Sequence, residues 1–331
     1  MKKVLILGGT GVMGTYLTRY LHEMGFELDV LALDQKESTQ NLTYLQANAK
    51  DKTVVAELLK NDYDAVVDFM MYNTEEFADT YQMFLDNTEQ YVFLSSYRVY
   101  ADDNPVCETS PRLLDVSTDQ VYLASDDYSL FKARSEDMLV RSGKKNWTIV
   151  RPTITYSAQR LQLVTLEGNT VINRSRQGKP VVLPKEALKA QTTMSFAGDV
   201  SKMIARLVLN KDAYGEAYTT ATAEHHSWET IAEYYREIVG LTYFPVEMDE
   251  FLSIRSDEEY DPYRWKLIYD RIYDRVIDNT KILNATGLKQ SELMPLKEGL
   301  SQCIAALDPN KTFGNLAYSD RMDAFLAQKG F

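Results

Sequence analysis

Cysteine and histidine are scarce in this chain. Its 331 residues include only Cys107 and Cys303, together with three histidines. Two distant thiols provide neither the disulfide framework of a small secreted domain nor the paired spacing of a zinc site. The adjacent His225 and His226 find no further ligands at suitable spacing. We therefore predict that Ser227 caps a helix there and that no metal is bound.

Long hydrophobic runs are also missing. The apolar run Val4–Leu7 is followed at once by glycines, which makes it too short for the core of a secretory signal. No stretch approaches the roughly 20 apolar residues that a membrane-spanning helix needs. We therefore expect no membrane partner and a cytoplasmic location.

Basic residues are fewer than acidic ones. The chain has 36 Lys and Arg against 48 Asp and Glu, which gives a net charge of -12 at pH 7. Such a surface repels the phosphates of nucleic acids, so we expect no nucleic-acid partner. A local pocket can still oppose the net charge and bind an anionic ligand. The hydrophobic content of 45% is that of a globular chain with a sizeable core.

Short apolar runs alternate with amphipathic ones through the first half of the chain. The predicted strands are Val4–Leu7, Leu28–Leu33, Leu42–Leu45, Ala65–Val67, Tyr91–Leu94 and Trp147–Val150. The predicted helices are Thr15–Met24, Thr53–Lys60, Thr74–Leu85 and Ser129–Ser142. Nearly continuous apolar strands separated by helices predict a parallel sheet covered on both faces. Right-handed crossovers make this an α/β, doubly wound (Rossmann) fold, with ligands at the carboxyl ends of the strands.

A glycine-rich loop follows the first predicted strand and opens the first helix. It runs Gly8-Gly9-Thr10-Gly11-Val12-Met13-Gly14. Glycine is needed where the turn is tight and the backbone approaches a diphosphate, to which the helix N-terminus presents free N–H groups. The sequence therefore predicts a dinucleotide site formed by Gly8, Thr10, Gly11, Val12, Met13 and Gly14.

Two carboxylates follow at the ends of later strands. Asp34 lies about twenty residues after Gly14, where it can accept hydrogen bonds from the adenosine ribose and repel a 2′-phosphate. This favours NAD over NADP, although the nearby Lys36 weakens the preference. Asp51 is placed to reach the adenine, and it fits a solvated helix cap nearly as well.

A proton-transfer pair is predicted beyond the fifth strand. Tyr128 and Lys132 are four residues apart, so on a helix they share one face. An ammonium group beside a phenol stabilises the phenolate, which suits the tyrosine to acid/base work. Ser95 and Ser96 end the fifth strand, where a hydroxyl can hydrogen-bond the substrate oxygen at the carbon that exchanges a hydride.

At this point the chain resembles the extended short-chain dehydrogenase/reductases, the NAD-dependent epimerase/dehydratase family. The matching segments are GGTGVMG, SSYRVY, YSLFK, Val150-Arg151-Pro152 and Phe196–Val200, with Asp34 and Asp51. The resemblance implies that Ser96, Tyr128 and Lys132 are catalytic and that Lys132 also holds the nicotinamide ribose. It implies further that Phe69 and Met70 line the cofactor.

The chain departs from the family pattern at several positions. Family 4,6-dehydratases carry Asp-Glu directly after the catalytic hydroxyl residue, where this chain has Tyr97 and Arg98. The acid/base that expels water is then missing, so a dehydratase is not expected. Ile154 and Thr192 replace an Asn and an Arg of many nucleotide-sugar enzymes, which weakens a nucleotide-sugar assignment. The candidates for holding an anionic substrate group instead are Arg98, Arg160, Arg271 and Arg275.

The second half is expected to form a substrate lobe. Helices are predicted at Gln159–Ser175, Asp199–Leu209 and Trp228–Val239, and the segment Tyr260–Arg275 is rich in Tyr, Asp and Arg. Its arginines either bind an anionic substrate or form ion pairs among themselves and the aspartates. We assign residues 1–155, with a contribution from about 190–222, to an NAD-binding Rossmann core. Residues 156–189 and 223–331 are assigned to a smaller C-terminal substrate-binding lobe.

The leading prediction is an NAD-dependent, sugar-type epimerase that transiently transfers a hydride to the nicotinamide. Its substrate would be a small molecule, such as a sugar or nucleotide sugar, and a homodimer is left open. The first alternative is an NAD(P)-dependent reductase or dehydrogenase of a small carbonyl or hydroxyl compound. The second is a cofactor-sensing or RNA-binding protein on the same fold, because a fold does not fix a function.

Overall fold

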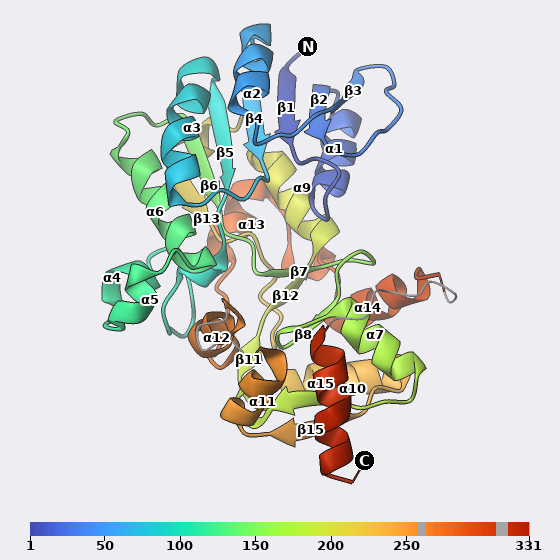
Figure 1. The fold of residues 1–331 in the computed structure, drawn as a ribbon. Helices are drawn as coiled ribbons and strands as arrows, with labels where there is room; N and C mark the ends of the chain where they lie inside the picture. Colours follow the sequence, from blue (N-terminus) through green and yellow to red (C-terminus); the bar gives the residue numbers. More distant parts are fainter. Residues whose placement is uncertain (257–261, 309–316, 331) are drawn as a thin grey trace.

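A seven-stranded parallel sheet forms the upper part of the molecule (Figure 1). The computed structural model describes residues 1–256, 262–308 and 317–330, so Tyr260 lies outside the described residues. In spatial order the strands are β13 (Glu216–Tyr218), β6 (Trp147–Val150), β5 (Gln90–Leu94), β4 (Ala65–Asp68), β1 (Lys3–Leu7), β2 (Glu27–Ala32) and β3 (Leu42–Gln46). This confirms the predicted doubly wound α/β fold. The strand order reverses between β1 and β4, which is where such sheets bind ligands.

Helices cover both faces of this sheet. One face is covered by α1 (Gly14–Glu23), α9 (Ala197–Leu207) and α13 (Thr280–Thr286). The other is covered by α2 (Lys52–Leu58), α3 (Thr74–Asn87) and α6 (Tyr128–Arg141). The strands β4, β5 and β6 are buried along their whole length, as expected of a sheet that packs on both sides.

Polar caps fix where two of these helices begin. Asn73 accepts a hydrogen bond from the N–H of Glu76, and the Glu76 side chain accepts one from the N–H of Asn73, which closes a capping box before α3. Asp127 begins α6, because its carboxylate accepts from the N–H of Ser129 at 3.0 Å. Tyr128 is thereby held as the first residue of α6.

The elements below the sheet in Figure 1 form a second body, called the lobe here. Its strands are β7 (Ile154–Tyr156), β8 (Gln162–Leu163), β9 (Leu166–Glu167), β10 (Val181–Pro184), β11 (Gln191–Thr192), β12 (Met194–Phe196), β14 (His226–Ser227) and β15 (Tyr243–Val246). Its helices are α7 (Gly168–Arg176), α8 (Lys185–Leu188), α10 (Trp228–Val239), α11 (Met248–Arg255), α12 (Pro262–Lys266), α14 (Leu296–Ala305) and α15 (Ala317–Gln328). The strands pair two by two, and an apolar cluster around Trp228, Tyr235 and Phe251 forms the core.

The helix predicted over Gln159–Ser175 is wrong in its first half. The chain forms the antiparallel pair β8–β9 there, and α7 begins only at Gly168. Val164 adopts a left-handed backbone with φ of 54°, which no helix interior accommodates. Gly168 lies so close to Leu161 that a Cβ there would stand 2.7 Å from the Leu161 Cβ. The hairpin, unlike a helix, directs Arg160, Gln162 and Glu167 toward the sheet.

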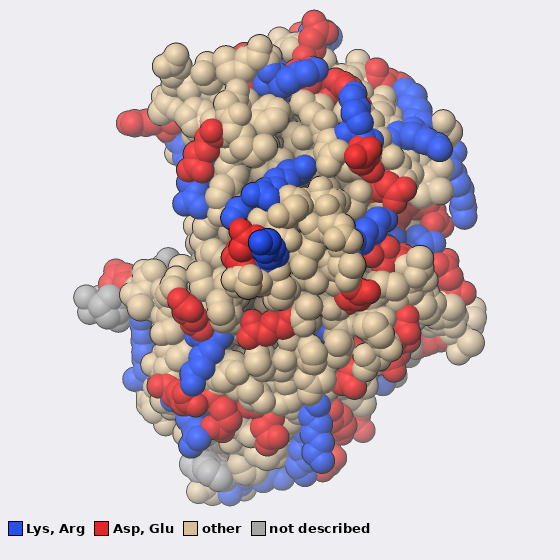
Figure 2. All heavy atoms as spheres, turned by 180° about the vertical axis from the view of Figure 1, so that it is seen from behind, with Lys and Arg blue, Asp and Glu red and all other residues tan. Residues whose placement is uncertain are grey.

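Short helices and a mixed surface complete the fold. α4 (Leu113–Val116) and α5 (Gln120–Ala124) precede α6, and Leu267–Arg271 forms a π-helical turn after α12. On the face shown in Figure 2, acidic and basic side chains are interspersed, and neither sign occupies a large area alone. None of the helices in the described ranges is long and apolar enough to cross a membrane.

Candidate active site

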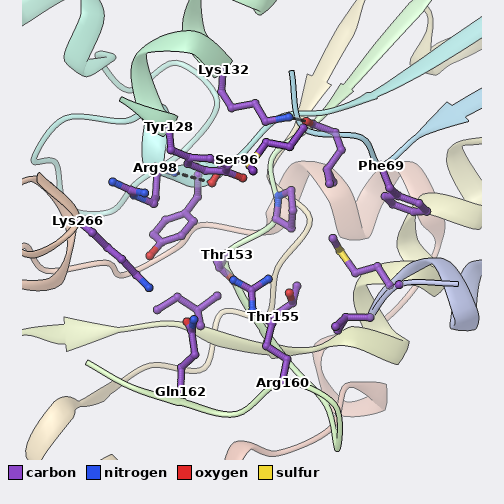
Figure 3. A pocket seen from close by; sticks show the side chains of 18 of the residues that line it. Phe69, Ser96, Arg98, Tyr128, Lys132, Thr153, Thr155, Arg160, Gln162 and Lys266 are labelled. Atoms are coloured by element: carbon purple, nitrogen blue, oxygen red, sulfur yellow. Dashed lines mark hydrogen bonds between the residues drawn. The ribbon is translucent and has the colours of Figure 1, made fainter. Parts of the chain in front are cut away.

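A cavity of about 640 Å³ lies between the carboxyl edge of the sheet and the lobe (Figure 3). One wall is built by the sheet and its loops and contains Gly8, Gly11, Val12, Met13, Gly14, Phe69, Met70, Leu94, Ser96, Arg98, Tyr128 and Lys132. The opposite wall contains Ile154, Thr155, Arg160, Gln162, Glu167, Tyr263, Lys266 and Arg271. Most of the residues predicted for cofactor and catalysis therefore meet in one space.

The glycine loop has the geometry of a diphosphate cradle. Gly8 adopts a left-handed backbone with φ of 76°, and a Cβ on Gly14 would lie 2.6 Å from the carbonyl oxygen of Gly8. Both positions therefore require glycine. The N-terminus of α1 has no side-chain cap at Met13 and no acidic residue in its first turn. The N–H of Thr15 donates to the carbonyl oxygen of Gly11 at 3.0 Å, and no capping side chain or first-turn carboxylate competes with an anion at this helix end, which fits a dinucleotide.

Lys132 is buried, with only 2% of its surface exposed. Its ammonium group donates to the carbonyl oxygen of Leu94 at 2.6 Å and lies 6.0 Å from the centre of the Tyr128 ring. Burial lowers the pKa of Lys132, while the carboxylates of Asp68 and Glu136 act in the opposite direction. The lysine side chain thus runs from α6 to the end of β5 beside the tyrosine.

Tyr128 and Ser96 approach the cavity from two different elements. Tyr128 starts α6, and its ring packs against Phe131 with 5.3 Å between ring centres. Ser96 follows β5 and is 5% exposed, and its hydroxyl oxygen accepts from the N–H of Arg98 at 3.2 Å. Figure 3 shows the side chains of Tyr128, Lys132 and Ser96 around the same part of the cavity.

The two adjacent serines have different partners. Ser95 points away from the cavity, and its hydroxyl donates to Oε1 of Glu136 at 2.5 Å. Glu136 in turn accepts two hydrogen bonds from the Arg151 guanidinium, both at 2.8 Å and both buried. Ser95 and the arginine of the Arg-Pro motif therefore support the structure behind the site, which leaves Ser96 as the serine that faces it.

Phe69 and Met70 line the cavity directly after β4, beside the glycine loop. The Met70 sulfur would lie 3.1 Å from a Cβ on Gly8. Asp68, just before them, accepts from the N–H of Met70 and from the Tyr91 hydroxyl, both at 2.8 Å. Burial raises the pKa of Asp68. This buried carboxylate fixes the turn that brings Phe69 and Met70 to the cavity.

Three predicted cofactor residues lie outside the cavity lining. Asp34 is exposed just beyond the end of β2. The Asp51 carboxylate accepts from the N–H groups of Thr53 and Val54 at 2.9 and 3.3 Å, so it serves as the cap of α2. Thr10 contributes its carbonyl oxygen to the hydroxyl of Thr15 at 3.0 Å. Contacts of these residues with a cofactor stay predictions.

The candidate arginines divide into two groups. Arg98, Arg160 and Arg271 line the cavity. Arg275 is buried elsewhere, where it donates to the carbonyl oxygens of Ala101 and Tyr100 at 2.8 and 3.0 Å. Arg271 and Arg275 both pair with the buried Asp270 carboxylate, so the interpretation of this segment as internal ion pairs holds for both, and Arg271 in addition lines the cavity.

Several cavity residues were not predicted from the sequence, among them Gln162, Glu167 and Lys266. Gln162 and Glu167 reach the cavity through the hairpin that was expected to be helix, and they are joined by a hydrogen bond of 3.0 Å. Lys266 lies at the end of α12, just before the π-helical turn, and it points into the cavity in Figure 3. A lysine among bulky apolar residues, Trp265 and Leu267, was the one available signal for it.

A Rossmann core whose glycine loop, Ser96, Tyr128 and Lys132 open into one cavity defines a nucleotide-dependent enzyme architecture of the short-chain dehydrogenase type. The family model of the NAD dependent epimerase/dehydratase family matches residues 4–221. The chain belongs to this family, as its motifs predicted. The NAD in the family's description agrees with the predicted cofactor.

Several known proteins are similar to this chain. The chloroplast stem-loop binding protein of 41 kDa b from Arabidopsis thaliana is 24% identical over 251 residues, which are 70% of this chain and 62% of that protein. UDP-glucose 4-epimerase of Thermus thermophilus, solved with NAD, has a TM-score of 0.68 at 17% identity, over 92% of this chain and 98% of that one. The Bordetella bronchiseptica enzyme WbmH, solved with NAD+, has a TM-score of 0.67 at 18% identity, over the same shares. At these identities the two structures show a shared fold.

Proposed function

We propose that this protein is an NAD-dependent epimerase that inverts one hydroxyl-bearing carbon of a sugar-type substrate. The observation that carries the proposal is the convergence of Ser96, Tyr128 and Lys132 on the cavity that the glycine loop also lines. Residues 1–155, with part of 190–222, would hold the cofactor, and the lobe would supply the substrate contacts.

NAD bound in this cavity would supply a carbon that can accept a hydride and return it. The chain's own groups do the remaining work. Tyr128 takes the proton of the substrate hydroxyl as the hydride leaves and gives a proton back when the hydride returns. The Lys132 ammonium favours the phenolate during that exchange, and the Ser96 hydroxyl orients the substrate oxygen. Lys132 would also hold the nicotinamide ribose.

The cofactor site is proposed to select NAD over NADP. Gly8, Thr10, Gly11, Val12, Met13 and Gly14 would hold the diphosphate, and Asp34 would receive the ribose hydroxyls. Phe69 and Met70 would pack beside the nicotinamide end. An exposed carboxylate at the end of β2 repels a 2′-phosphate, which supports the preference.

A dehydratase is disfavoured by the side chains after Ser96. The Tyr97 hydroxyl donates to Asp270 at 2.7 Å and accepts from Arg271 at 2.8 Å. Both hydrogen bonds lie within the protein, so this hydroxyl is not free to act as the acid of a dehydratase. Arg98 is a cation and cannot deliver a proton to a leaving hydroxyl at working pH. The inverting step without loss of water is therefore the chemistry that these residues support.

The test is to identify what the purified protein retains and produces. We expect NAD to stay bound through purification and to be released only when the protein is denatured by heat. An epimerase returns the hydride to the substrate, so the cofactor does not have to leave between turnovers. Incubation with candidate sugars, followed by proton NMR and absorbance at 340 nm, should show a new epimer without accumulating NADH. Stoichiometric NADH would instead support a dehydrogenase with net cofactor turnover.

A second candidate function comes from the name of the Arabidopsis relative, a stem-loop binding protein. This chain spans 62% of that protein's length, so the function of the whole relative is a proposal here. The net charge of -12 and the mixed surface of Figure 2 disfavour it. Gel-shift titration with an RNA stem-loop at about 0.15 M salt would decide, and submicromolar binding would restore this candidate.

A further inference from the structure

The cavity has an excess of positive charge. Among the described residues, five cationic side chains line it, and Glu167 is the one carboxylate that does so. The five are Arg98, Lys132, Arg160, Lys266 and Arg271. The proposed epimerase mechanism uses Lys132 alone, which leaves four cations without an assigned role. They oppose the sign of the whole chain, whose net charge is -12.

Part of this charge is only weakly neutralised behind the cavity wall. The buried Asp270 carboxylate pairs with Arg271 and also lies 3.1 Å from Arg275 and 3.9 Å from Arg98. A single carboxylate thus provides the counter-charge for three guanidinium groups. Arg98 reaches Asp127 at 3.4 Å, but its buried Nε has no hydrogen-bond acceptor. The charge of Arg98 is therefore incompletely compensated within the protein.

Lys266 has one distant counter-charge at the cavity. Its side chain is 14% exposed, and its ammonium group lies 3.6 Å from Glu167, which Gln162 already engages. Burial lowers the pKa of Lys266 well below its usual value, and the charges of Arg271, Arg98 and Arg160 push in the same direction. An anion in the cavity would relieve this repulsion.

The cations surround the end of the cavity that contains the acid/base residue. The Arg98 guanidinium carbon lies 5.2 Å from the centre of the Tyr128 ring. Figure 3 shows Lys266 and Arg160 directed into the space that Tyr128 also enters. Arg160 comes from the lobe and is exposed toward solvent. An anionic group bound by Lys266 and Arg98 would therefore sit close to the reacting carbon.

We propose that the substrate carries a carboxylate or phosphate group beside the carbon that exchanges the hydride, and that Lys266, Arg98 and Arg160 bind it. This inference rests on the proposed epimerase function and names its substrate class, a sugar acid or sugar phosphate. Guanidinium groups match such anions with paired N–H donors, and the lysine adds a point charge.

The test measures binding, so it does not depend on turnover. The NAD-loaded protein is titrated by calorimetry with two matched pairs, glucose against glucuronate and UDP-glucose against UDP-glucuronate. Glucose 6-phosphate separates a phosphate from a carboxylate. We expect the acid to bind at least tenfold more tightly than the neutral sugar within each pair. Equal affinity within both pairs, together with glucose 6-phosphate binding no more tightly than glucose, would overturn the proposal, because the cavity would then recognise neither anionic group.

Variants of Lys266 test whether this lysine causes the preference for the acid over the neutral sugar. Lys266→Met should abolish the preference for the acid while the affinity for the neutral partner and for NAD is unchanged. Lys266→Arg should retain most of it. Lys185→Met, at an exposed ion pair on α8, is the matched control and should change nothing. An undiminished preference in Lys266→Met would contradict the assignment.

The outcomes for the substrate class and for the epimerase proposal are distinguishable. Tight binding of the acid without inversion of any carbon would retain the anion site and reject the epimerase. Inversion of neutral sugars with no preference for their acids would retain the epimerase and reject the anion site.

Discussion

Lys132 and Leu94 are joined by a hydrogen bond of 2.6 Å from the lysine ammonium to the leucine carbonyl oxygen. The bond ties α6 to the end of β5, two residues before Ser96. It also gives the buried ammonium one fixed acceptor and leaves its other two N–H donors for further contacts. The position of the cation beside Tyr128 is therefore set by the sheet and not by the flexible lysine chain alone.

Lys132→Met should weaken NAD binding and reduce turnover together, because the ammonium is assigned to both the ribose and the tyrosine. A hydrogen bond to a charged group contributes about 1.5–3 kcal/mol, so we expect a loss of roughly tenfold or more in NAD affinity. Calorimetric titration of the folded variant measures it. Lys52→Met, exposed on α2, serves as control. Unchanged affinity for NAD would remove Lys132 from the cofactor site.

Tyr128→Phe should separate binding from chemistry. The variant keeps the ring packing on Phe131 and loses only the hydroxyl, so NAD affinity should stay normal while turnover falls by roughly 10²-fold or more. Rates with an epimerised substrate provide the measurement. Tyr81→Phe on α3, outside the cavity lining, is the control. A variant that turns over at near-normal rate would exclude Tyr128 as the acid/base.

Asp34 should determine the cofactor preference. With its carboxylate at the end of β2, the wild-type protein should bind NAD more tightly than NADP, and Asp34→Asn should narrow that difference by about tenfold. Parallel titrations with both cofactors provide the ratio. Tighter binding of NADP by the wild type would contradict the role of Asp34 and indicate that Lys36 determines the cofactor preference.

Most of the sheet could be predicted from the sequence because its strands are buried on both faces. The run Val4–Leu7 is apolar throughout and Trp147–Val150 is apolar except for Thr148, which is typical of a parallel sheet covered on both faces. β13 was missed because Glu216–Tyr218 is three residues long and has no apolar run. The β8–β9 hairpin was missed because its register depends on the contact of Gly168 with Leu161 and not on local periodicity.

The site was predictable where a motif fixes the backbone. The glycine loop, Ser96, Tyr128 and Lys132 line one cavity, each placed by an adjoining strand or helix. Lys266 could not be assigned in advance, since only the tertiary packing of α12 brings it opposite Tyr128. The roles of all these residues in binding and catalysis remain predictions that the variants above address.

The buried pair Glu136–Arg151 should contribute strongly to stability. Each group is almost fully buried, and the two are joined by two hydrogen bonds of 2.8 Å. Glu136→Gln leaves the guanidinium charge buried without a counter-charge, so the free energy of unfolding should fall by about 3–5 kcal/mol. Urea denaturation measures the change, with Glu23→Gln at an exposed pair on α1 as control. A loss below about 1 kcal/mol, the value of a surface ion pair, would contradict the assignment.

Anion binding should depend on pH through Lys266. Burial and the neighbouring Arg271, Arg98 and Arg160 lower the pKa of this lysine, whereas Glu167 alone acts to raise it. An anion binds the protonated form and raises the pKa again. As the pH rises through the lowered pKa, the free protein loses the proton, so binding must then take up a proton and the affinity must fall.

Calorimetry of glucuronate binding in buffers of different ionisation enthalpy measures this proton uptake directly. We expect uptake on the alkaline side of the lowered pKa and none well below it, and affinity should fall by up to tenfold per pH unit in the alkaline range. Lys266→Arg should bind the acid without this dependence, because a guanidinium stays protonated throughout. A pH-independent affinity in the wild type, with the same buffers, would show that Lys266 does not change its protonation when the anion binds.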